Sequence, residues 1–501
     1  MMNRSAFTGW IRLAAACALI AFPQNASGRL PQATQALTWP ASTPEKQGLD
    51  SETLTRIFSI VKERHIAIHS LQVVRNGVLV LDACFYPFEP KLVHDCASVT
   101  KSIMSLLIGI AIDQGCIASV DELVVPSFPD RTILHLTEYK RKLSVRSLLT
   151  MSSGYSSDPD HDEDLLREMR GSGDWIQFVL DKPVESPPDA RFSYCSINFH
   201  LLAGIIKNKT GLSPGEFSRR YLFSPLGIRE VIWPSDPAGI NFGWGDLHLL
   251  PADMAKIGYL CLNKGLWGSK RIVSENWISE STQPHVTIDS DEAYGFGWWI
   301  RPWPSPGIYE ALGRGGQRIV VWPGRNMVIV FTGGYFEPGE PGRIIVDAVK
   351  SDSALPENPR FHDLLRKRIE EAGHPPAPER AQALPAIAGR INGKDFIFTD
   401  NPFGFRTVRF DFSGRDQGGL KIVKTNSVLE IPFGLDGVYR RSMTGDFNLP
   451  RLARAAWQGE NRLVLDLYQV CRMNSEEFSI KFDDDKVTIE REHMRAEGRI
   501  R

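Results

Sequence analysis

The chain has 501 residues, of which 42% are hydrophobic, 10% aromatic and 23% charged, a composition typical of a soluble globular protein. This composition excludes a collagen-like, disordered or multi-spanning chain, and the length suggests roughly three domain-sized units. With 58 Lys and Arg against 59 Asp and Glu, the net charge of -1 gives no general attraction to nucleic acid or to an anionic membrane surface.

Residues 1–28 are typical of a secretory signal peptide. Arg4 and Arg12 precede an apolar run over residues 13–22, and small residues follow it. The run is too short to span a bilayer, which takes about 20 residues. Lipidation at Cys17 is the less favoured alternative, because the apolar run continues past that cysteine. We therefore expect a periplasmic or secreted protein with no membrane span after cleavage.

Two helices and a hairpin are predicted after this segment. Residues 50–65 carry apolar side chains at helical spacing and lead into two strands joined at Asn76-Gly77, a favoured hairpin turn. A second helix, over residues 98–114, is apolar nearly all round and stops at Gly115. Such a helix must be buried on every side and is expected at the centre of a domain.

Polar loops and short helices are predicted over residues 120–290, after which the pattern returns to strands. The strand-like runs cover residues 294–300, 318–322 and 327–332. Strands at both ends with helices between them predict one α+β domain over residues 29–370, with a mixed sheet closed by strands distant in sequence.

A proline-rich linker is predicted over residues 371–386, and the remainder of the chain is all strand. Apolar and polar residues alternate around Val408, Leu465 and Ile480. Residues 387–501 should therefore form a small antiparallel β domain, a barrel or a sandwich.

The cysteines do not indicate a metal site, because none lies in a Cys-x-x-Cys pair or next to a metal-spaced histidine. In an exported protein Cys84 could form a disulfide with Cys96 or Cys116, and buried free thiols explain the same residues equally well.

Ser98 and Lys101 stand at the start of the buried helix. The i, i+3 spacing puts the hydroxyl and the amine on one face, and the helix N-terminus supplies a field that favours a developing anion. A serine nucleophile needs such activation. Ser59 and Lys62 have the same spacing within an amphipathic helix, away from its start, and we expect them to be a surface pair.

Two later elements could complete a site. Tyr194 precedes an apolar helix, and beside a lysine its phenolate would be favoured and could take the proton of a serine; taken alone, it could equally be a packed aromatic. Gly313-Arg-Gly-Gly-Gln317 precedes a strand, and its glycines would let a ligand approach the strand amides, although a plain strand-entry turn is as good an explanation.

Together these elements resemble the serine β-lactamase and penicillin-binding-protein superfamily, whose motifs are Ser-x-x-Lys, then Tyr-x-Asn or Ser-x-Asn, then Lys-Thr-Gly or His-x-Gly. The resemblance spans about residues 40–350 and is to the class-C-like branch, which includes family VIII carboxylesterases, D-amino-acid-specific peptidases and 6-aminohexanoate-dimer hydrolases. The stretches that support this branch are Val73-Val-Arg-Asn-Gly, Leu148-Leu-Thr-Met-Ser-Ser-Gly154, Pro251-Ala-Asp253-Met-Ala and Tyr294-Gly-Phe-Gly-Trp. The chain after about residue 385, including Gly434-Leu-Asp-Gly-Val-Tyr439, is similar to the lipocalin-like β domain attached to some of these hydrolases.

The resemblance implies a serine hydrolase that forms an acyl-enzyme with a small-molecule ester or amide and uses no metal or organic cofactor. Ser98 would attack the carbonyl, Lys101 and Tyr194 would handle the proton, and the backbone N–H groups of Ser98 and Gln317 would hold the oxyanion. The alternatives are β-lactamase or D-amino-acid peptidase activity, or a binding or sensing module that does not turn over.

The substrate would contact Ser196, Arg314, Gly315 and Gly316. Ser196 stands where the family has Asn, and Arg314 stands where it has Lys or His. Arg314 could bind a carboxylate on the substrate, or it could form a surface ion pair with Glu310.

The remaining candidates near these motifs have structural explanations. Asp95 is expected to cap the helix that begins at Ser98, rather than to form a triad with His94, and His248 and Asp253 are expected to be structural.

Overall fold

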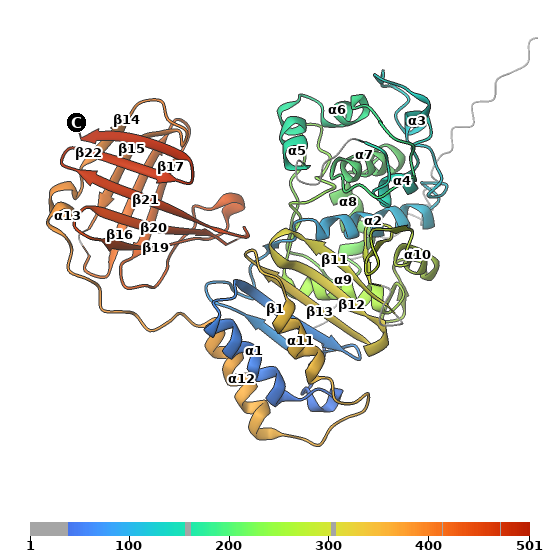
Figure 1. Ribbon diagram of the computed structural model, residues 1–501, viewed down its shortest axis with the longest axis horizontal. Helices are drawn as coiled ribbons and strands as arrows, with labels where there is room; N and C mark the ends of the chain where they lie inside the picture. The colour runs from blue at the N-terminus through green and yellow to red at the C-terminus, as the bar shows by residue number, and fades with distance from the viewer. Residues whose placement is uncertain (1–38, 156–161, 302–306, 413, 471, 501) are drawn as a thin grey trace, which may run out of the picture.

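The fold is described from a computed structural model, which covers residues 39–155, 162–301, 307–412, 414–470 and 472–500. The segment predicted to be an export signal lies outside the described residues. Figure 1 shows a larger N-terminal domain and a separate C-terminal barrel. Over the described ranges, no helix is both long enough and apolar enough to cross a membrane.

The N-terminal domain is built on one antiparallel sheet that joins strands distant in sequence. Its order is β2, β1, β13, β12, β11, β10, β9, β8. Strand β1 near the start of the domain pairs with β13 near its end, as the sequence predicts. The strands are β1 (Ile68–Arg75), β2 (Val78–Cys84), β8 (Val286–Thr287), β9 (Ala293–Tyr294), β10 (Trp299–Arg301), β11 (Ile308–Gly313), β12 (Gln317–Trp322) and β13 (Met327–Gly333).

One expected strand is in fact a hairpin. Residues 294–300 form the end of β9, a tight turn and the start of β10, with Tyr294 paired to Trp299. The turn contains Gly297 at φ 77°, in the left-handed region, where the backbone leaves the extended conformation. The apolar run alone does not distinguish such a turn from a continuous strand.

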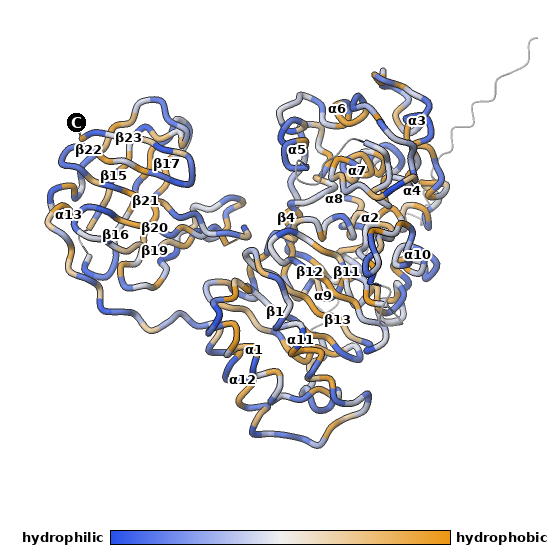
Figure 2. Tube along the Cα trace, viewed as in Figure 1, coloured by the Kyte–Doolittle hydropathy of each residue, from blue (hydrophilic) through white to orange (hydrophobic). Residues whose placement is uncertain are grey.

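Helices cover both faces of this sheet. Helices α1 (Ser51–Glu63), α11 (Gly339–Ala348) and α12 (Pro359–Gly373) pack together on one face. Helices α9 (Pro251–Leu262) and α2 (Val99–Asp113) lie on the other, and Figure 2 shows α9 and strands β11 to β13 largely in hydrophobic colours.

Helix α2 is buried on all sides, as its composition predicts, with Val99 to Ala111 all buried. It packs against helix α7 (Ile197–Thr210) of a helical cluster and against strand β11 of the sheet. The other helices of this half are α3 (Glu138–Arg141), α4 (Val145–Leu149), α5 (Asp162–Gly171), α6 (Trp175–Asp181), α8 (Pro214–Ser218) and α10 (Glu275–Ser281). Short strands β3 (His94–Asp95), β4 (Val231–Ile232) and β5 (His248–Leu249) form a second sheet, and β6 (Leu266–Trp267) pairs with β7 (Lys270–Arg271).

The C-terminal domain is a closed barrel. After α12 ends at Gly373, the described chain has no helix or strand until α13 (Ala386–Ile391). Ten strands then form one sheet, which closes through a pairing of Gly434 in β17 with Arg454 in β19. They are β14 (Asp395–Phe398), β15 (Phe405–Asp411), β16 (Gln417–Lys424), β17 (Val428–Gly434), β18 (Arg440–Ser442), β19 (Arg451–Gln458), β20 (Arg462–Gln469), β21 (Ser475–Asp483), β22 (Lys486–Arg491) and β23 (Met494–Ile500).

The interior of the barrel is filled by its own side chains. Phe396, Phe410 and Phe482 are fully buried there, and the cavity among the core residues has a volume of only about 30 Å³. A barrel that holds a ligand needs an open lumen. This barrel has no room for one along its described core.

Five cysteines are described as free thiols: Cys84, Cys96, Cys116, Cys195 and Cys261. Of the two explanations that the sequence left open for Cys84, Cys96 and Cys116, the structure therefore favours thiols over a disulfide. Burial raises the pKa of Cys84 to about 12, so this thiol stays protonated.

Candidate active site

The structure brings Ser98, Lys101 and Tyr194 into direct contact. The Lys101 ammonium donates a hydrogen bond to Ser98 Oγ at 2.8 Å, and the Tyr194 hydroxyl donates to the same oxygen at 2.9 Å. Lys101 Nζ also lies 4.9 Å from the centre of the Tyr194 ring. A serine oxygen that contacts an amine and a phenol at once has two routes for its proton.

The turn before α2 presents Ser98. Ala97 adopts φ 45°, a left-handed conformation that costs on the order of 1–3 kcal/mol for a residue with a Cβ. The Ala97 N–H donates to Asp95 Oδ1 at 2.7 Å, which holds the turn. Asp95 therefore caps this turn one residue ahead of Ser98. Burial raises the pKa of the Asp95 carboxyl.

Lys101 is held by a second contact that the sequence did not reveal. Its side chain is only 1% exposed, and the ammonium also donates to the Trp244 carbonyl at 2.9 Å. Gly243 lets this loop approach α7, because a Cβ at that position would lie 1.9 Å from the Phe199 carbonyl oxygen. The Lys101 amine is thereby fixed toward Ser98.

Aromatic side chains form one wall of the site. The Tyr194 ring stacks on Trp299 with ring centres 6.1 Å apart, and Phe192 and Tyr294 pack on the same tryptophan. Burial raises the pKa of the Tyr294 hydroxyl well above its ordinary value, so this tyrosine is neutral. The sequence signals for this wall were Tyr194 itself and the Tyr294-Gly-Phe-Gly-Trp stretch, which ends one residue before Trp299.

The end of strand β11 lies beside the backbone at Ser98. A Cβ at Gly313 would lie 3.1 Å from the Ser98 amide nitrogen and 2.7 Å from the Cys96 carbonyl oxygen, so only glycine fits there. In the described chain, strand β11 pairs with β10 from Ile308 to Glu310. From Ala311 to Gly313, the edge of β11 that faces β10 therefore has no strand partner, and we call this stretch the open edge of β11.

Gln317, the expected second oxyanion donor, is the first residue of β12 and pairs with Gly313. Its buried side chain donates to the Gly333 carbonyl at 2.7 Å and accepts from the Gly333 N–H at 3.1 Å. The side chain therefore ties this turn to β13. The structure also brings the end of β11 at Gly313 beside the Ser98 amide, so this edge is a further candidate for the second oxyanion donor.

The four residues expected to contact the substrate contact other parts of the protein instead, and Arg314 is the most exposed of them. Arg314 is half-exposed and pairs with Glu163 at 2.8 Å, while Glu310 pairs with Arg301 and Arg318 instead. The ion pair that the sequence offered for Arg314 thus has another carboxylate as its partner.

Ser196 is buried, and its N–H donates to Asp162 Oδ1 at 2.8 Å. Gly315 and Gly316 make room for protein side chains: a Cβ at these positions would lie 2.6 Å from Met473 Sδ and 2.6 Å from the Phe336 ring, respectively. Both glycines also line a depression of about 360 Å³ at the end of β11, together with Arg314 and Tyr335.

The other candidates are structural in this fold. Ser59 is exposed on α1, as expected for a surface residue. The His94 ring is hydrogen-bonded to His69 at 2.8 Å, and Asp253 pairs with Lys256 at 2.7 Å. His248 is hydrogen-bonded through Nδ1 to the Asp246 carbonyl at 2.9 Å.

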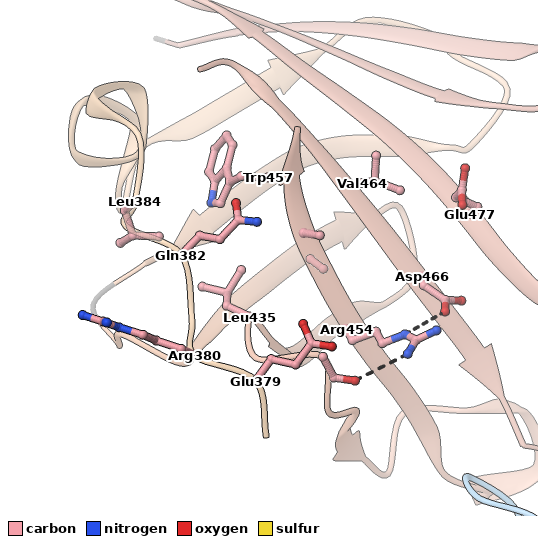
Figure 3. A pocket seen from close by; sticks show the side chains of 13 residues that line it. Glu379, Arg380, Gln382, Leu384, Leu435, Arg454, Trp457, Val464, Asp466 and Glu477 are labelled. Atoms are coloured by element: carbon pink, nitrogen blue, oxygen red, sulfur yellow. Dashed lines mark hydrogen bonds and ion pairs between the residues drawn. The ribbon is translucent and has the colours of Figure 1, made fainter. Parts of the chain in front are cut away.

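A separate cavity of about 390 Å³ lies on the barrel, between the linker and strands β19 and β20 (Figure 3). Arg454 donates to Asp466 at 3.1 Å and to the Gly437 carbonyl at 3.4 Å, so its charge is satisfied within the protein. The residues lining this cavity include no serine, cysteine, histidine or lysine. Hydrolytic chemistry therefore points to Ser98.

Comparisons with known proteins identify the family of the chain. The model of the Beta-lactamase family matches residues 54–348. The 6-aminohexanoate-dimer hydrolase of Paenarthrobacter ureafaciens is 24% identical over 297 residues, which is 53% of this chain and 72% of that protein. A putative 6-aminohexanoate-dimer hydrolase from Bacillus anthracis aligns in structure over 67% of this chain and 87% of that one, with 20% identity and a TM-score of 0.48. A family VIII carboxylesterase aligns over 64% of this chain and 96% of that one, with 15% identity and a TM-score of 0.45. Because the family match covers more than half of the residues, the chain belongs to the Beta-lactamase family of serine hydrolases.

Proposed function

We propose that this protein hydrolyses a small ester or amide through an acyl-enzyme on Ser98, after export to the periplasm or the medium. The observation that carries the proposal is the position of Ser98 Oγ, within hydrogen-bond distance of both Lys101 Nζ and Tyr194 Oη. Ser59, which has the same spacing to a lysine, is exposed on a helix surface. Of these two serines, Ser98 is the one that combines a helix N-terminus with two proton-transfer groups.

In the proposed mechanism the pair of Lys101 and Tyr194 first releases one proton to solvent, which leaves either a neutral amine or a phenolate beside Ser98. Ser98 Oγ then forms a bond to the substrate carbonyl carbon, and its proton passes to this basic member of the pair. The negative charge that develops on the carbonyl oxygen is held by the Ser98 N–H and by a backbone amide at the open edge of β11. The pair then protonates the leaving alcohol or amine as its bond to carbon breaks. A water molecule attacks the acyl-enzyme in the second half-reaction, and its proton follows the same route back to Ser98.

The walls favour a neutral substrate with an apolar group. Tyr194 and Trp299 present aromatic surface beside Ser98. Arg314 is already paired with Glu163, so it offers little to a substrate carboxylate. We propose ester cleavage ahead of amide cleavage, because an ester has the better leaving group.

A non-catalytic sensor of the same fold is the second candidate, because Ser196 replaces the usual asparagine beside the site. The test is pre-steady-state kinetics with 4-nitrophenyl butyrate, with a D-amino-acid anilide and a chromogenic cephalosporin as parallel substrates. An enzyme shows a burst followed by steady turnover, whereas a sensor stops after one equivalent.

Ser98→Ala should abolish both the burst and labelling by a fluorophosphonate, while the matched variant Ser59→Ala should retain both. Ser59 is suitable as the control because it also precedes a lysine by three residues but is exposed. Equal losses in the two variants would show that Ser98 is not the nucleophile.

A further inference from the structure

Two loops of the barrel contact residues whose neighbours lie beside Ser98: His248, which pairs with Asp95, and Gly315, which follows Gly313 by two residues. Phe447, between β18 and β19, packs its ring edge-on to His248 with ring centres 5.6 Å apart. His248 pairs in turn with Asp95, in the strand that leads to Ser98. Met473, between β20 and β21, packs directly on Gly315, since a Cβ on that glycine would lie 2.6 Å from its sulfur.

The Gly315 turn is the connection between β11 and β12. Gly315 adopts φ 81° and its carbonyl accepts a hydrogen bond from the Tyr335 N–H at 3.0 Å. The main chain of Met473 lies against the next turn of the sheet, because a Cβ at Gly334 would lie 2.6 Å from the Met473 carbonyl oxygen. The Gly315 turn is thus enclosed between the barrel and the end of β13.

The barrel is fixed at this position by an interface of its own. Phe88 of the N-terminal domain is buried in one cluster with Leu452 and Val470 of the barrel. The Tyr439 N–H donates to the Tyr86 hydroxyl at 3.0 Å, and Arg441 pairs with Glu89 at 2.7 Å. A barrel held by apolar and polar contacts can hold Met473 at a defined place.

The end of β11 needs such support. Beyond Glu310 the described strand has lost its β10 partner, and it is this stretch that carries Gly313 beside the Ser98 amide. Displacing a reacting group by about 1 Å can cost on the order of 100-fold in rate.

We propose that the C-terminal barrel completes the active site in cis, with Met473 as a positioning residue that holds the Gly315 turn and, through it, the oxyanion edge of β11. This proposal rests on the proposed function of Ser98. The packed interior of the barrel agrees with a supporting role, because it leaves about 30 Å³ of space inside.

The test uses the full chain with three substitutions. Met473→Ala removes the contact, Met473→Leu restores apolar volume, and Met443→Ala is the matched control, since Met443 lies on the same barrel but is 60% exposed. Three quantities are measured on each: hydrogen exchange of the segment 311–317, and the acylation rate and KM with 4-nitrophenyl butyrate. Thermal unfolding confirms that each variant is folded.

Met473→Ala should exchange faster over residues 311–317 and should acylate roughly 10- to 100-fold more slowly with KM nearly unchanged, because the loss falls on the transition state. Met473→Leu should recover most of the rate, and Met443→Ala should match the wild type. Unchanged exchange, or faster exchange with an unchanged rate, would overturn the proposal.

Gly315→Ala alone probes the same contact if Met473→Ala is poorly folded, and the two substitutions form a double-mutant cycle if it folds. Gly315→Ala places a methyl group against Met473 Sδ and should slow acylation, and the loss should be smaller in the Met473→Ala background. Strictly additive losses would overturn the contact. If the wild type never acylates while Met473→Ala still exchanges faster, the proposed function fails and the packing role of Met473 stands.

Discussion

Tyr194 is the residue on which the proton route depends most directly. Its hydroxyl lies 2.9 Å from Ser98 Oγ. We expect Tyr194→Phe to fold normally and to lower kcat by about 10²- to 10⁴-fold with little change in KM, since proton transfer matters in the transition state. The measurement is steady-state kinetics with 4-nitrophenyl butyrate.

The matched control is Tyr155→Phe. Tyr155 is buried, and within the described chain its hydroxyl has no hydrogen-bond partner, so its removal should leave kcat unchanged. A Tyr194→Phe enzyme as fast as this control would show that Tyr194 only packs against the site.

Arg314 gives a second prediction at the scale of a residue. Its guanidinium is half-exposed and paired with an equally exposed Glu163, and such surface pairs contribute about 0–1 kcal/mol. Arg314→Ala should therefore change kcat/KM by less than about 5-fold, and equally for a carboxylate-bearing ester and its neutral counterpart. A loss confined to the carboxylate-bearing ester would show that the substrate displaces Glu163, and Glu163→Gln should then improve binding of that ester.

Helix α2 shows how an element carries the site. The helix presents Ser98 and Lys101 only if its axis stays in place, and Gly109 lets it approach α10 closely. A Cβ at Gly109 would lie 2.3 Å from the Trp277 ring. Gly109→Ala should therefore destabilise the protein by about 1–3 kcal/mol, although alanine has the higher helix propensity.

Urea unfolding compares Gly109→Ala with Gly171→Ala at the end of α5. Gly171 has no neighbouring atom within 4 Å of its Cβ position, so alanine there should be neutral or slightly stabilising. Equal unfolding midpoints for the two variants would mean that α2 can shift to accept the methyl group.

At the scale of the whole molecule, a buried histidine pair lies where the two domains meet. The His69 and His94 rings are hydrogen-bonded at 2.8 Å, and Tyr468 of the barrel packs edge-on to His69. Burial, followed by the neighbouring His94, lowers the pKa of His69, and burial lowers the pKa of His94 to about 4. Both are therefore neutral in the folded protein at pH 7.

The direction of the pH effect follows from this neutrality. The unfolded histidines titrate near 6.5, so between about pH 6.5 and 4 the unfolded state binds more protons than the folded state. The contribution of these histidines to the free energy of unfolding should be fully present above about pH 6.5 and should be lost as the pH drops toward 4. His94 should account for about 3 kcal/mol of this loss.

Urea unfolding at pH 7.5, 6 and 5 measures this loss. His94→Gln should flatten the dependence, while the same change at the exposed His493 should leave it as in the wild type. A His94→Gln profile as steep as the wild type would assign the acid sensitivity to other groups.

Local spacing by itself predicted most elements of this protein and the candidate nucleophile. The apolar residues from Val99 to Ala111 specify a buried helix, and a serine at its start with a lysine three residues on share one face in any structure that forms this helix. Alternating apolar residues likewise predicted an all-β domain after the linker. These features depend on residues that lie only a few positions apart, so their pattern is visible along the sequence.

Only the tertiary structure decided which distant groups meet. The Trp244 carbonyl on Lys101, Glu163 on Arg314, the open edge of β11 beside Ser98 and Met473 on Gly315 join residues that lie far apart in sequence. The glycine motif therefore suggested a ligand-binding turn, whereas the folded chain uses the space above Gly315 for a side chain of the barrel. The physical reason is that packing depends on how two sheets and their loops come together, and side-chain volume at an interface leaves no periodic signal in either segment.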